Sequence, residues 1–282
     1  MNQFRPNSFK LLPDVVKNLL IINILFYIGT IIFYNRLDID LTELLGLHMV
    51  GSSKFEVYQF VTYMFLHDPN NFSHILFNMF ALWMFGNAIE NTWGSKRFLI
   101  YYLVTGIGAA VIQYAVFYFE LRPTLEIFDV YLQNPSNEAL VTLFQNGKII
   151  SNGSTELQML ISEFTDKYNA LVTTAPDKAL QLSVEFMQQY RADFLSLPTV
   201  IGASGAVFGL LLAFGMMFPN SVIYIYFLIP LKAKYFVIIY GALELVMGFT
   251  GSQSNVAHFA HLGGMLFGFI LIQFWKKKYG YI

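Results

Sequence analysis

A serine and a histidine that lie far apart in the chain each stand near the start of a strongly apolar segment. Ser204 lies in a Gly-Ala-Ser-Gly sequence in the segment 199–218, and His261 lies in an Ala-His-Leu-Gly-Gly sequence in the segment 256–275. A serine hydroxyl becomes an effective nucleophile when a neighbouring base removes its proton, and an imidazole can be that base. The two residues therefore predict a site for serine-dependent hydrolysis between two apolar helices.

Two further polar side chains, His74 and Asn78, lie near the start of a third apolar segment, 72–89. Their spacing of four residues places both on one face of a helix. Each can donate a hydrogen bond to the negatively charged oxygen that forms when a carbonyl is attacked. The backbone N–H of Ser204 at a helix N-terminus can do the same. We therefore expect His74 and Asn78 to stabilise that oxygen beside Ser204 and His261.

The composition is that of an integral membrane protein. Apolar residues make up 56% of the chain and charged residues 12%, and the mean hydropathy is +0.52. A soluble domain carries about 25% charged residues. The chain has no cysteine, which excludes disulfides, thiolate catalysis and cysteine-ligated metal. No cluster of basic residues indicates nucleic-acid binding.

Six apolar segments, each close to the ~20 residues that a bilayer requires, are expected to cross the membrane as helices. They are 15–34, 72–89, 98–119, 199–218, 235–249 and 256–275. Lys and Arg in short loops mark the cytoplasmic side. With six crossings these residues and both termini share one side: Arg5, Lys10, Lys17, Lys96, Arg97, Lys232, Lys234, Lys276, Lys277 and Lys278.

This orientation places the polar residues of three segments at one depth. Even-numbered segments run from the outside inward, so Ser204, His261, His74 and Asn78 are expected roughly 3–10 Å below the outer boundary, at ~1.5 Å per helical residue. Polar groups inside a membrane usually face the bundle interior or water. The sequence therefore predicts that the four side chains converge in a water-accessible cavity.

The chain divides into three predicted regions. Residues 1–119 hold the first three segments and an apolar external loop, 35–71, which is expected to lie partly in the outer leaflet. Residues 120–198 are expected to form a small external insertion, mostly helical. Residues 199–282 hold the last three segments and a basic cytoplasmic tail.

The insertion is polar and carries its own signals of structure. Thr155-x-x-Gln158 predicts a capping box at the start of a helix that continues to about Ala170. Asp177 is expected to cap a second helix, and Asn146-Gly147 is expected to form a hairpin turn between two short strands. The alternative is a partly disordered loop.

Other polar residues of the apolar segments have alternative explanations. A metal site formed by His258 and His261, with His74 as a third candidate ligand, is the alternative, and it is disfavoured because no carboxylate lies beside them in the sequence. We therefore expect no metal and no cofactor. Glu244 is predicted to make a structural hydrogen bond. The remaining predictions are that Glu90 and Arg97 fix the turn after the second segment, and that His48 and His67 are ordinary polar or capping residues.

The order and spacing of these motifs resemble the rhomboid family of intramembrane serine proteases. The resemblance spans roughly 58–94 and 199–274. It is carried by His-Ile-Leu-Phe-Asn at 74–78, Glu90 with Gly94, Gly-Ala-Ser-Gly at 202–205 and Ala-His-Leu-Gly-Gly at 260–264.

The resemblance implies an all-α bundle of six transmembrane helices with the insertion between the third and fourth. It implies that Ser204 is the nucleophile and His261 its partner, in a dyad without a third acidic member. It also implies that His74 and Asn78 line the oxyanion site, and that Phe208 packs on His261. The chain departs from the family where Tyr58-Gln59 replaces a Trp-Arg pair, and in the length of its insertion.

The expected function is that of an endopeptidase which cleaves single-pass membrane proteins within a transmembrane segment, near the external boundary. The expected partners are these substrates and the lipid bilayer; a partner for the insertion is unknown. One alternative is a non-catalytic relative that binds membrane proteins. Another is a small transporter, which would require internal repeats that the sequence lacks. The small number of helices and the absence of a transit peptide favour a bacterial plasma membrane.

Overall fold

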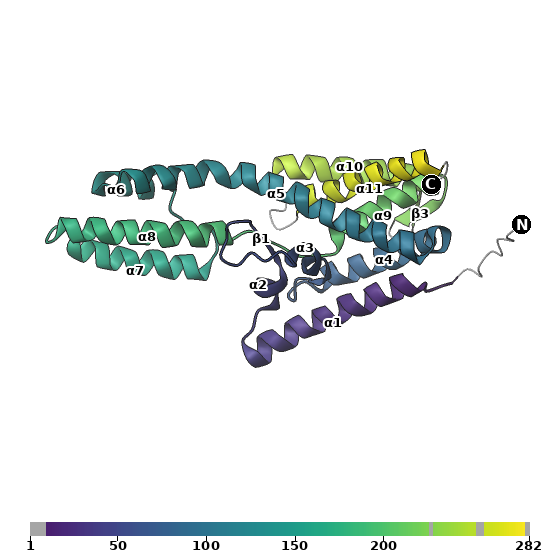
Figure 1. Ribbon diagram of the computed structural model, residues 1–282, viewed down its shortest axis with the longest axis horizontal. Helices are drawn as coiled ribbons and strands as arrows, with labels where there is room; N and C mark the ends of the chain where they lie inside the picture. Colours follow the sequence, from purple (N-terminus) through teal and green to yellow (C-terminus); the bar gives the residue numbers. More distant parts are fainter. Residues whose placement is uncertain (1–9, 226–227, 252–256, 280–282) are drawn as a thin grey trace, which may run out of the picture. The chain divides into compact units, whose positions relative to one another are not determined.

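The structure is a computed structural model that describes residues 10–225, 228–251 and 257–279, and it is mainly helical (Figure 1). The all-α prediction is thereby confirmed. The chain forms two compact units. Unit 1 comprises residues 1–47, 57–114 and 200–282, and unit 2 comprises residues 48–56 and 115–199. Ser204, His261, His74 and Asn78 all lie in unit 1, so the candidate site is formed within a single unit.

Unit 1 is a bundle of long helices with short connecting elements. Its described elements are α1 (Asp14–Leu37), α2 (Leu41–Leu45), α3 (Gln59–Thr62), η1 (Tyr63–Phe65), α4 (Phe72–Trp93), the first half of α5 (Ser95–Gln133), α9 (Ser204–Met217), β3 (Val222–Ile225), β4 (Ile229–Lys232), α10 (Ala233–Thr250) and α11 (His258–Tyr279). Helix α9 packs against α4, α10 and α11. Strands β3 and β4 form an antiparallel pair that connects α9 to α10.

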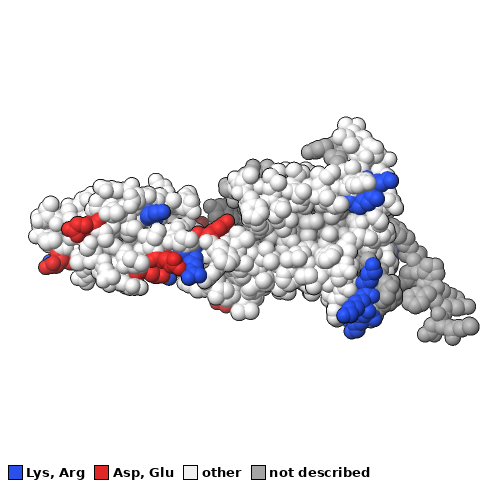
Figure 2. Space-filling view, turned by 90° about the horizontal axis from the view of Figure 1, so that it is seen from above, with Lys and Arg blue, Asp and Glu red and all other residues white. Residues whose placement is uncertain are grey.

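Five of these helices, α1, α4, α5, α10 and α11, are long and apolar enough to cross a membrane. Many large apolar side chains on these helices are exposed. Lys and Arg gather at one end of unit 1 (Figure 2). The chain is therefore a multi-pass membrane protein. Helix α9, the fourth predicted crossing, has only 14 residues. The crossing count of six stays a prediction.

The fourth segment is helical over less of its length than its composition suggests. Residues 199–203 are apolar or small, but Thr199–Val200 form the short strand β2 and Gly202 has a φ of +124°. A helix cannot pass through such a backbone conformation. Helix α9 consequently begins at Ser204. Most of its residues are buried, which explains why the helix is apolar on all sides.

The third segment shows the opposite difference. It was expected to end at Phe119, but α5 continues to Gln133 and has 39 residues. Polar side chains after residue 119 change the helix surface without ending the helix. Pro123 lies inside α5 and removes one backbone donor. Residue polarity therefore marked the end of the apolar stretch, not the end of the helix.

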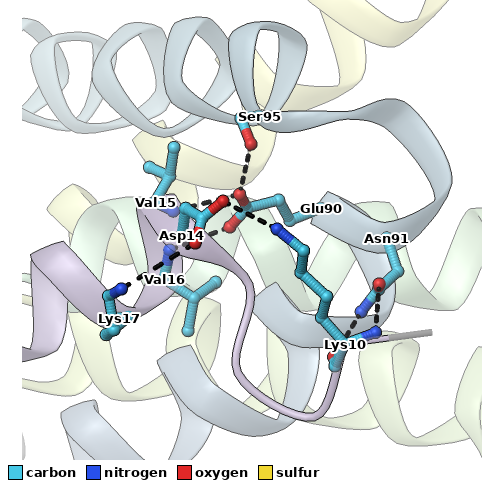
Figure 3. A network of polar contacts seen from close by, with 8 residues as sticks. All are labelled: Lys10, Asp14, Val15, Val16, Lys17, Glu90, Asn91 and Ser95. Carbon is cyan, nitrogen blue, oxygen red and sulfur yellow. Dashed lines mark hydrogen bonds and ion pairs between the residues drawn. The ribbon is translucent and has the colours of Figure 1, made fainter. Parts of the chain in front are cut away.

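Glu90 fixes the start of α1 against α4 (Figure 3). Its carboxylate accepts hydrogen bonds from the backbone N–H groups of Val15 at 3.0 Å and Val16 at 2.8 Å. It also accepts one from the Ser95 hydroxyl at 2.6 Å, in the turn between α4 and α5. The predicted role of Glu90 in that turn is thus one part of a larger role. Arg97 lies over the Trp275 ring, 5.1 Å from its centroid.

Unit 2 contains the second half of α5 and the helices α6 (Asn137–Gln145), α7 (Thr155–Leu171) and α8 (Pro176–Ser196). The strands β1 (Leu47–His48) and β2 lie where the chain passes from one unit to the other. Helices α7 and α8 lie side by side (Figure 1). The unit has an aromatic-rich core of its own: Phe128, Tyr131, Leu140, Ile149, Leu157, Phe164, Tyr168, Ala179, Phe186, Met187, Tyr190 and Phe194.

The helix predicted from Thr155 is present as α7, but its cap is one residue earlier. The Ser154 hydroxyl accepts a hydrogen bond from the Leu157 N–H at 3.2 Å. Asp177 lies in the first turn of α8 and does not cap it, because Pro176 already occupies the first helical position. The predicted hairpin was wrong, since residues 142–145 form the last turn of α6.

Candidate active site

The structure brings the predicted nucleophile and base together. Ser204 Oγ lies 2.8 Å from His261 Nε2, within hydrogen-bonding distance. Ser204 is the first residue of α9, and His261 is the fourth residue of α11. The His261 side chain is buried, and Ser204 is partly buried. The serine therefore stands at a helix N-terminus, where unpaired backbone N–H groups and the helix dipole favour negative charge.

A close helix contact next to the pair explains how the two side chains meet. Gly264 follows His261 by almost one turn, and Gly205 follows Ser204 directly. A Cβ atom at position 264 would lie 2.7 Å from the Gly205 carbonyl carbon and closer still to its oxygen. Only glycine permits this approach of the two backbones.

Two further glycines, Gly209 of α9 and Gly268 of α11, contact a third helix. A Cβ at Gly209 would lie 2.6 Å from Thr105 Cβ, and a Cβ at Gly268 would lie 3.0 Å from the ring carbon Cζ of Tyr101. Both neighbours belong to α5. Of these glycine contacts, the one between Gly264 and Gly205 therefore brings α9 and α11 together, whereas Gly209 and Gly268 bring them against α5.

An aromatic ring packs against one face of the His261 imidazole. The ring of Phe208, one turn after Ser204, lies parallel to that of His261, with a centroid distance of 4.2 Å and an interplanar angle of 4°. Tyr240 of α10 also stacks on Phe208, with a centroid distance of 5.3 Å. Phe208 therefore occupies the place that the family resemblance implies, and it restricts rotation of the His261 ring.

His74 lies beside Ser204 with a defined hydrogen-bonding arrangement. The Asp68 backbone N–H donates to His74 Nδ1 over 3.4 Å, so a neutral His74 carries its proton on Nε2. His74 Nε2 and Ser204 Oγ lie 3.0 Å and 3.7 Å, respectively, from the point where a Cβ on Gly202 would be. His74 Nε2 and Ser204 Oγ consequently border the same space beside Gly202.

Asn78 lies one turn further along α4 and is buried. Its Nδ2 donates a hydrogen bond to the His74 carbonyl oxygen at 2.8 Å. This bond uses one of the two N–H groups of the amide and fixes the orientation of the side chain. His74 and Asn78 therefore share a helix face, as their spacing predicts.

A residue whose role at the site was missed is Glu244 of α10. Its Oε2 lies 2.9 Å from His261 Nδ1 and 2.7 Å from His258 Nδ1, and all three side chains are buried. No carboxylate is near the two histidines in the sequence, but the fold places the Glu244 carboxylate beside both of them. The expectation that they have no neighbouring carboxylate was therefore wrong. A signal existed: α10 and α11 are consecutive apolar helices, so Glu244 and His261 lie at similar distances from the connection between them.

The same three side chains are the group that could hold a metal ion among the described residues. Glu244, His258 and His261 each offer a ligand atom, and these atoms lie within 4.8 Å of one another. His74, which the sequence analysis considered as a ligand, is not in the group. The ligand atoms already make short contacts with one another, so a metal would have to replace these hydrogen bonds.

The histidines outside the site serve other contacts. His67 is fully buried, and its ring meets the edge of His74 at a centroid distance of 5.0 Å. Burial, and secondarily the nearby His74, lower the pKa of His67 to about 3. Neither ring nitrogen of His67 has a hydrogen bond of good geometry. His48 Nδ1 lies 3.2 Å from the Thr199 hydroxyl within unit 2.

Comparison with known proteins gives consistent matches. A family model described as Rhomboid domain matches residues 54–120 and 168–277. An uncharacterized mitochondrial rhomboid protein of Schizosaccharomyces pombe is 24% identical over 295 residues, which covers 97% of this chain and 68% of that protein. The chloroplastic rhomboid-like protein 11 of Arabidopsis thaliana is 39% identical over 59 residues, which is 21% of this chain and 20% of that protein.

Proposed function

The chain belongs to the rhomboid family of intramembrane serine proteases, and from this premise we propose that it is a serine endopeptidase acting on transmembrane segments. The observation that carries the proposal is the 2.8 Å distance between Ser204 Oγ and His261 Nε2. A hydroxyl and an imidazole at this distance are the minimum requirement for nucleophilic attack on a peptide carbonyl.

In the first step Ser204 Oγ attacks the scissile carbonyl carbon while His261 Nε2 takes the hydroxyl proton. The carbonyl oxygen becomes negatively charged. The His74 Nε2–H, the Asn78 amide and the backbone N–H of Ser204 donate hydrogen bonds to it. His261 then gives its proton to the leaving amine, and an acyl ester remains on Ser204.

In the second step a water molecule attacks the ester carbonyl. His261 Nε2 removes a proton from the water and afterwards returns it to Ser204 Oγ. The carboxylic acid product leaves, and the serine is regenerated. The same donors stabilise the second tetrahedral intermediate, because its oxygen develops at the same position.

The substrate is a single-pass membrane protein that is cleaved near the external boundary of the membrane. A transmembrane helix satisfies its backbone hydrogen bonds internally, so it must unwind locally before its carbonyl can be attacked. Segments with small or helix-breaking residues near the external boundary unwind at the lowest cost. The chemistry therefore favours substrates of this kind.

The test is cleavage of a single-pass reporter by the purified protein in proteoliposomes. Ser204→Ala is expected to abolish cleavage without changing the unfolding temperature. Ser162→Ala, on the exposed face of α7, is the matched control and is expected to cleave like the wild type. Retained cleavage by Ser204→Ala would remove Ser204 from the nucleophile role. A wild type that binds the reporter without cleaving it would indicate the non-catalytic binder instead.

The topology completes the proposal. Both termini and the basic tail are cytoplasmic, and residues 120–198 form an external insertion. Because the chain has no cysteine, single cysteines introduced at the exposed positions Asp166 and Lys277 report on sidedness. A membrane-impermeant maleimide is expected to label position 166 in intact cells and position 277 only after permeabilisation. The opposite pattern would reverse the orientation.

A separate measurement determines which cellular membrane contains the protein. A plasma membrane remains the expectation from the sequence, whereas the names of the two relatives place those proteins in mitochondria and chloroplasts. Fractionation of the source cells, with an antibody against unit 2, decides between these membranes.

A further inference from the structure

Glu244 is a carboxylate in the interior of the apolar helix α10, where an ionisable side chain is costly. It is buried, and its Oε2 contacts the Nδ1 atoms of both His258 and His261. A carboxylate in such surroundings is stable only when hydrogen-bond donors compensate for the lost hydration. Two imidazole N–H groups supply this compensation.

The geometry points to Glu244 as a positioning residue for His261, so that Ser204, His261 and Glu244 act as a triad and not as a dyad. This inference rests on the proposed function, since it assigns a partner to the proposed base. It differs from the family resemblance, which implies no acidic third member.

The position of the proton on the neutral His261 ring determines whether the ring can act as a base. To accept the proton of Ser204, Nε2 must be unprotonated, and a neutral imidazole then carries its proton on Nδ1. Glu244 Oε2, 2.9 Å from Nδ1, is an acceptor and therefore stabilises this tautomer. Without the carboxylate, the neutral ring can carry its proton on Nε2. Nε2 then cannot accept the proton of Ser204.

The same contact stabilises the charged ring during the reaction. When Ser204 Oγ bonds to the carbonyl carbon, its proton moves to His261 Nε2 and the ring becomes an imidazolium. The Nδ1 proton stays on His261, and Glu244 stays ionised. The resulting ion pair lies in a buried site, where charge interactions are stronger than in water. No other proton donor or acceptor is needed to balance this step.

His258 restrains the carboxylate itself. Its Nδ1 lies 2.7 Å from the same oxygen of Glu244, and the two histidine rings are nearly perpendicular, with an angle of 87°. Oε2 is thus held between two donors from successive turns of α11. With Phe208 stacked on its face, His261 is fixed by contacts on three sides.

A purely structural role, in which Glu244 only joins α10 to α11, makes a different prediction. Such a role would appear in the unfolding temperature and leave the turnover of folded enzyme unchanged. Positioning of His261 would appear in kcat, with KM nearly constant, because the contact acts on the base and not on the bound substrate. The two roles can therefore be separated by steady-state kinetics on folded protein.

The experiment compares Glu244→Gln and Glu244→Asp with the wild type, using reporter cleavage and thermal unfolding. Replacing the acid of a Ser-His-acid triad by its amide can lower kcat by about 10⁴-fold. For Glu244→Gln we expect a loss of 10²–10⁴-fold in kcat, with KM within about threefold. Glu244→Asp keeps the charge and is expected to recover at least tenfold of this loss. His258→Asn is expected to lose about tenfold, because it loosens the carboxylate.

Glu90→Gln is the matched control, because Glu90 is also a buried carboxylate of unit 1 but contacts neither histidine. It is expected to lower stability and leave kcat unchanged. If Glu244→Gln does not fold, the kcat of His258→Asn carries the test, because Glu244→Asp keeps the charge and is expected to recover activity. A kcat within threefold of the wild type in folded Glu244→Gln, or in His258→Asn where Glu244→Gln does not fold, would overturn the inference.

Two further outcomes are distinguishable. If the wild type itself neither cleaves the reporter nor reacts with a fluorophosphonate, the proposed function fails, independently of Glu244. If a chelator abolishes wild-type cleavage and Zn²⁺ restores it, Glu244 and the two histidines are metal ligands, and the positioning role is overturned. Cleavage that is insensitive to chelators and depends on the Glu244 carboxylate supports the triad.

Discussion

The contact between Gly205 and Gly264 gives the sharpest quantitative prediction, for the substitution Gly264→Ala. The added Cβ would lie 2.7 Å from the Gly205 carbonyl carbon, whereas an ordinary contact begins at 3.4 Å. Because the neighbour is backbone and its carbonyl oxygen is nearer still, α9 and α11 must separate by more than about 0.7 Å. Overpacking of this kind costs about 1–3 kcal/mol of stability.

The same separation acts on the proposed catalytic pair. Added to the present 2.8 Å between Ser204 Oγ and His261 Nε2, a separation of this size takes the two atoms to about 3.5 Å or beyond, outside good hydrogen-bonding distance. A misplacement near 1 Å in an active site can cost about 10²-fold in rate. We therefore expect Gly264→Ala to lower kcat/KM by about 10²-fold.

Reporter cleavage and thermal unfolding in the same detergent measure the two effects. Gly29→Ala in α1 is the matched control, because its added Cβ would meet only Leu41 Cδ1, at 3.9 Å. This control is expected to keep wild-type activity. If Gly264→Ala cleaves within threefold of Gly29→Ala, the close helix contact does not set the geometry of the site, and the reasoning is refuted.

Two other predictions concern stability. Glu90→Gln removes the charged acceptor of the Val15 and Val16 N–H groups and is expected to cost about 1–3 kcal/mol, measured by denaturant unfolding; a loss below 0.5 kcal/mol would contradict the capping role. His67 has a pKa of about 3 when folded and an ordinary pKa near 6.5 when unfolded, so the unfolded state binds the proton first as the pH falls. Stability from this residue is therefore unchanged above pH 6.5 and declines towards pH 3, by about 2 kcal/mol at pH 5. His67→Phe is expected to reduce the difference in unfolding free energy between pH 7 and pH 5 by the contribution of His67. An unchanged difference would contradict the low pKa of His67 in the folded protein.

The convergence of Ser204, His261 and His74 could be predicted because it needs only helix direction and depth. Each residue lies near the start of an apolar segment that runs in the same direction across the membrane. Polar side chains at one depth in several helices have few stable arrangements other than contact with one another. Apolar length and loop charge supplied all that this argument requires.

Glu244 could not be assigned with the same means. Its contact with His261 depends on the rotation of α10 about its own axis, which packing against neighbouring helices determines. The sequence places the two residues at similar distances from the connecting loop but does not specify which face of α10 meets α11. The carboxylate was therefore expected to be structural, and its two histidine contacts appear only in three dimensions.

Helix ends were the other feature that composition did not determine. Helix α9 begins five residues later than its apolar segment because Gly202 has a φ that α-helices do not adopt. Helix α5 continues past Phe119 and through Pro123, which removes one backbone donor without ending the helix. An apolar segment indicates which residues can lie in the membrane interior, whereas helix ends depend on local backbone geometry.

The most direct test of the central claim is the site of covalent modification by a fluorophosphonate, determined by mass spectrometry of the purified protein. The account predicts one adduct on Ser204, and its formation is expected to slow by at least 10²-fold in His261→Asn, because the base is missing. Two results would contradict this mechanism: an adduct on another residue in wild-type protein that cleaves the reporter, or equally fast formation of the adduct in His261→Asn.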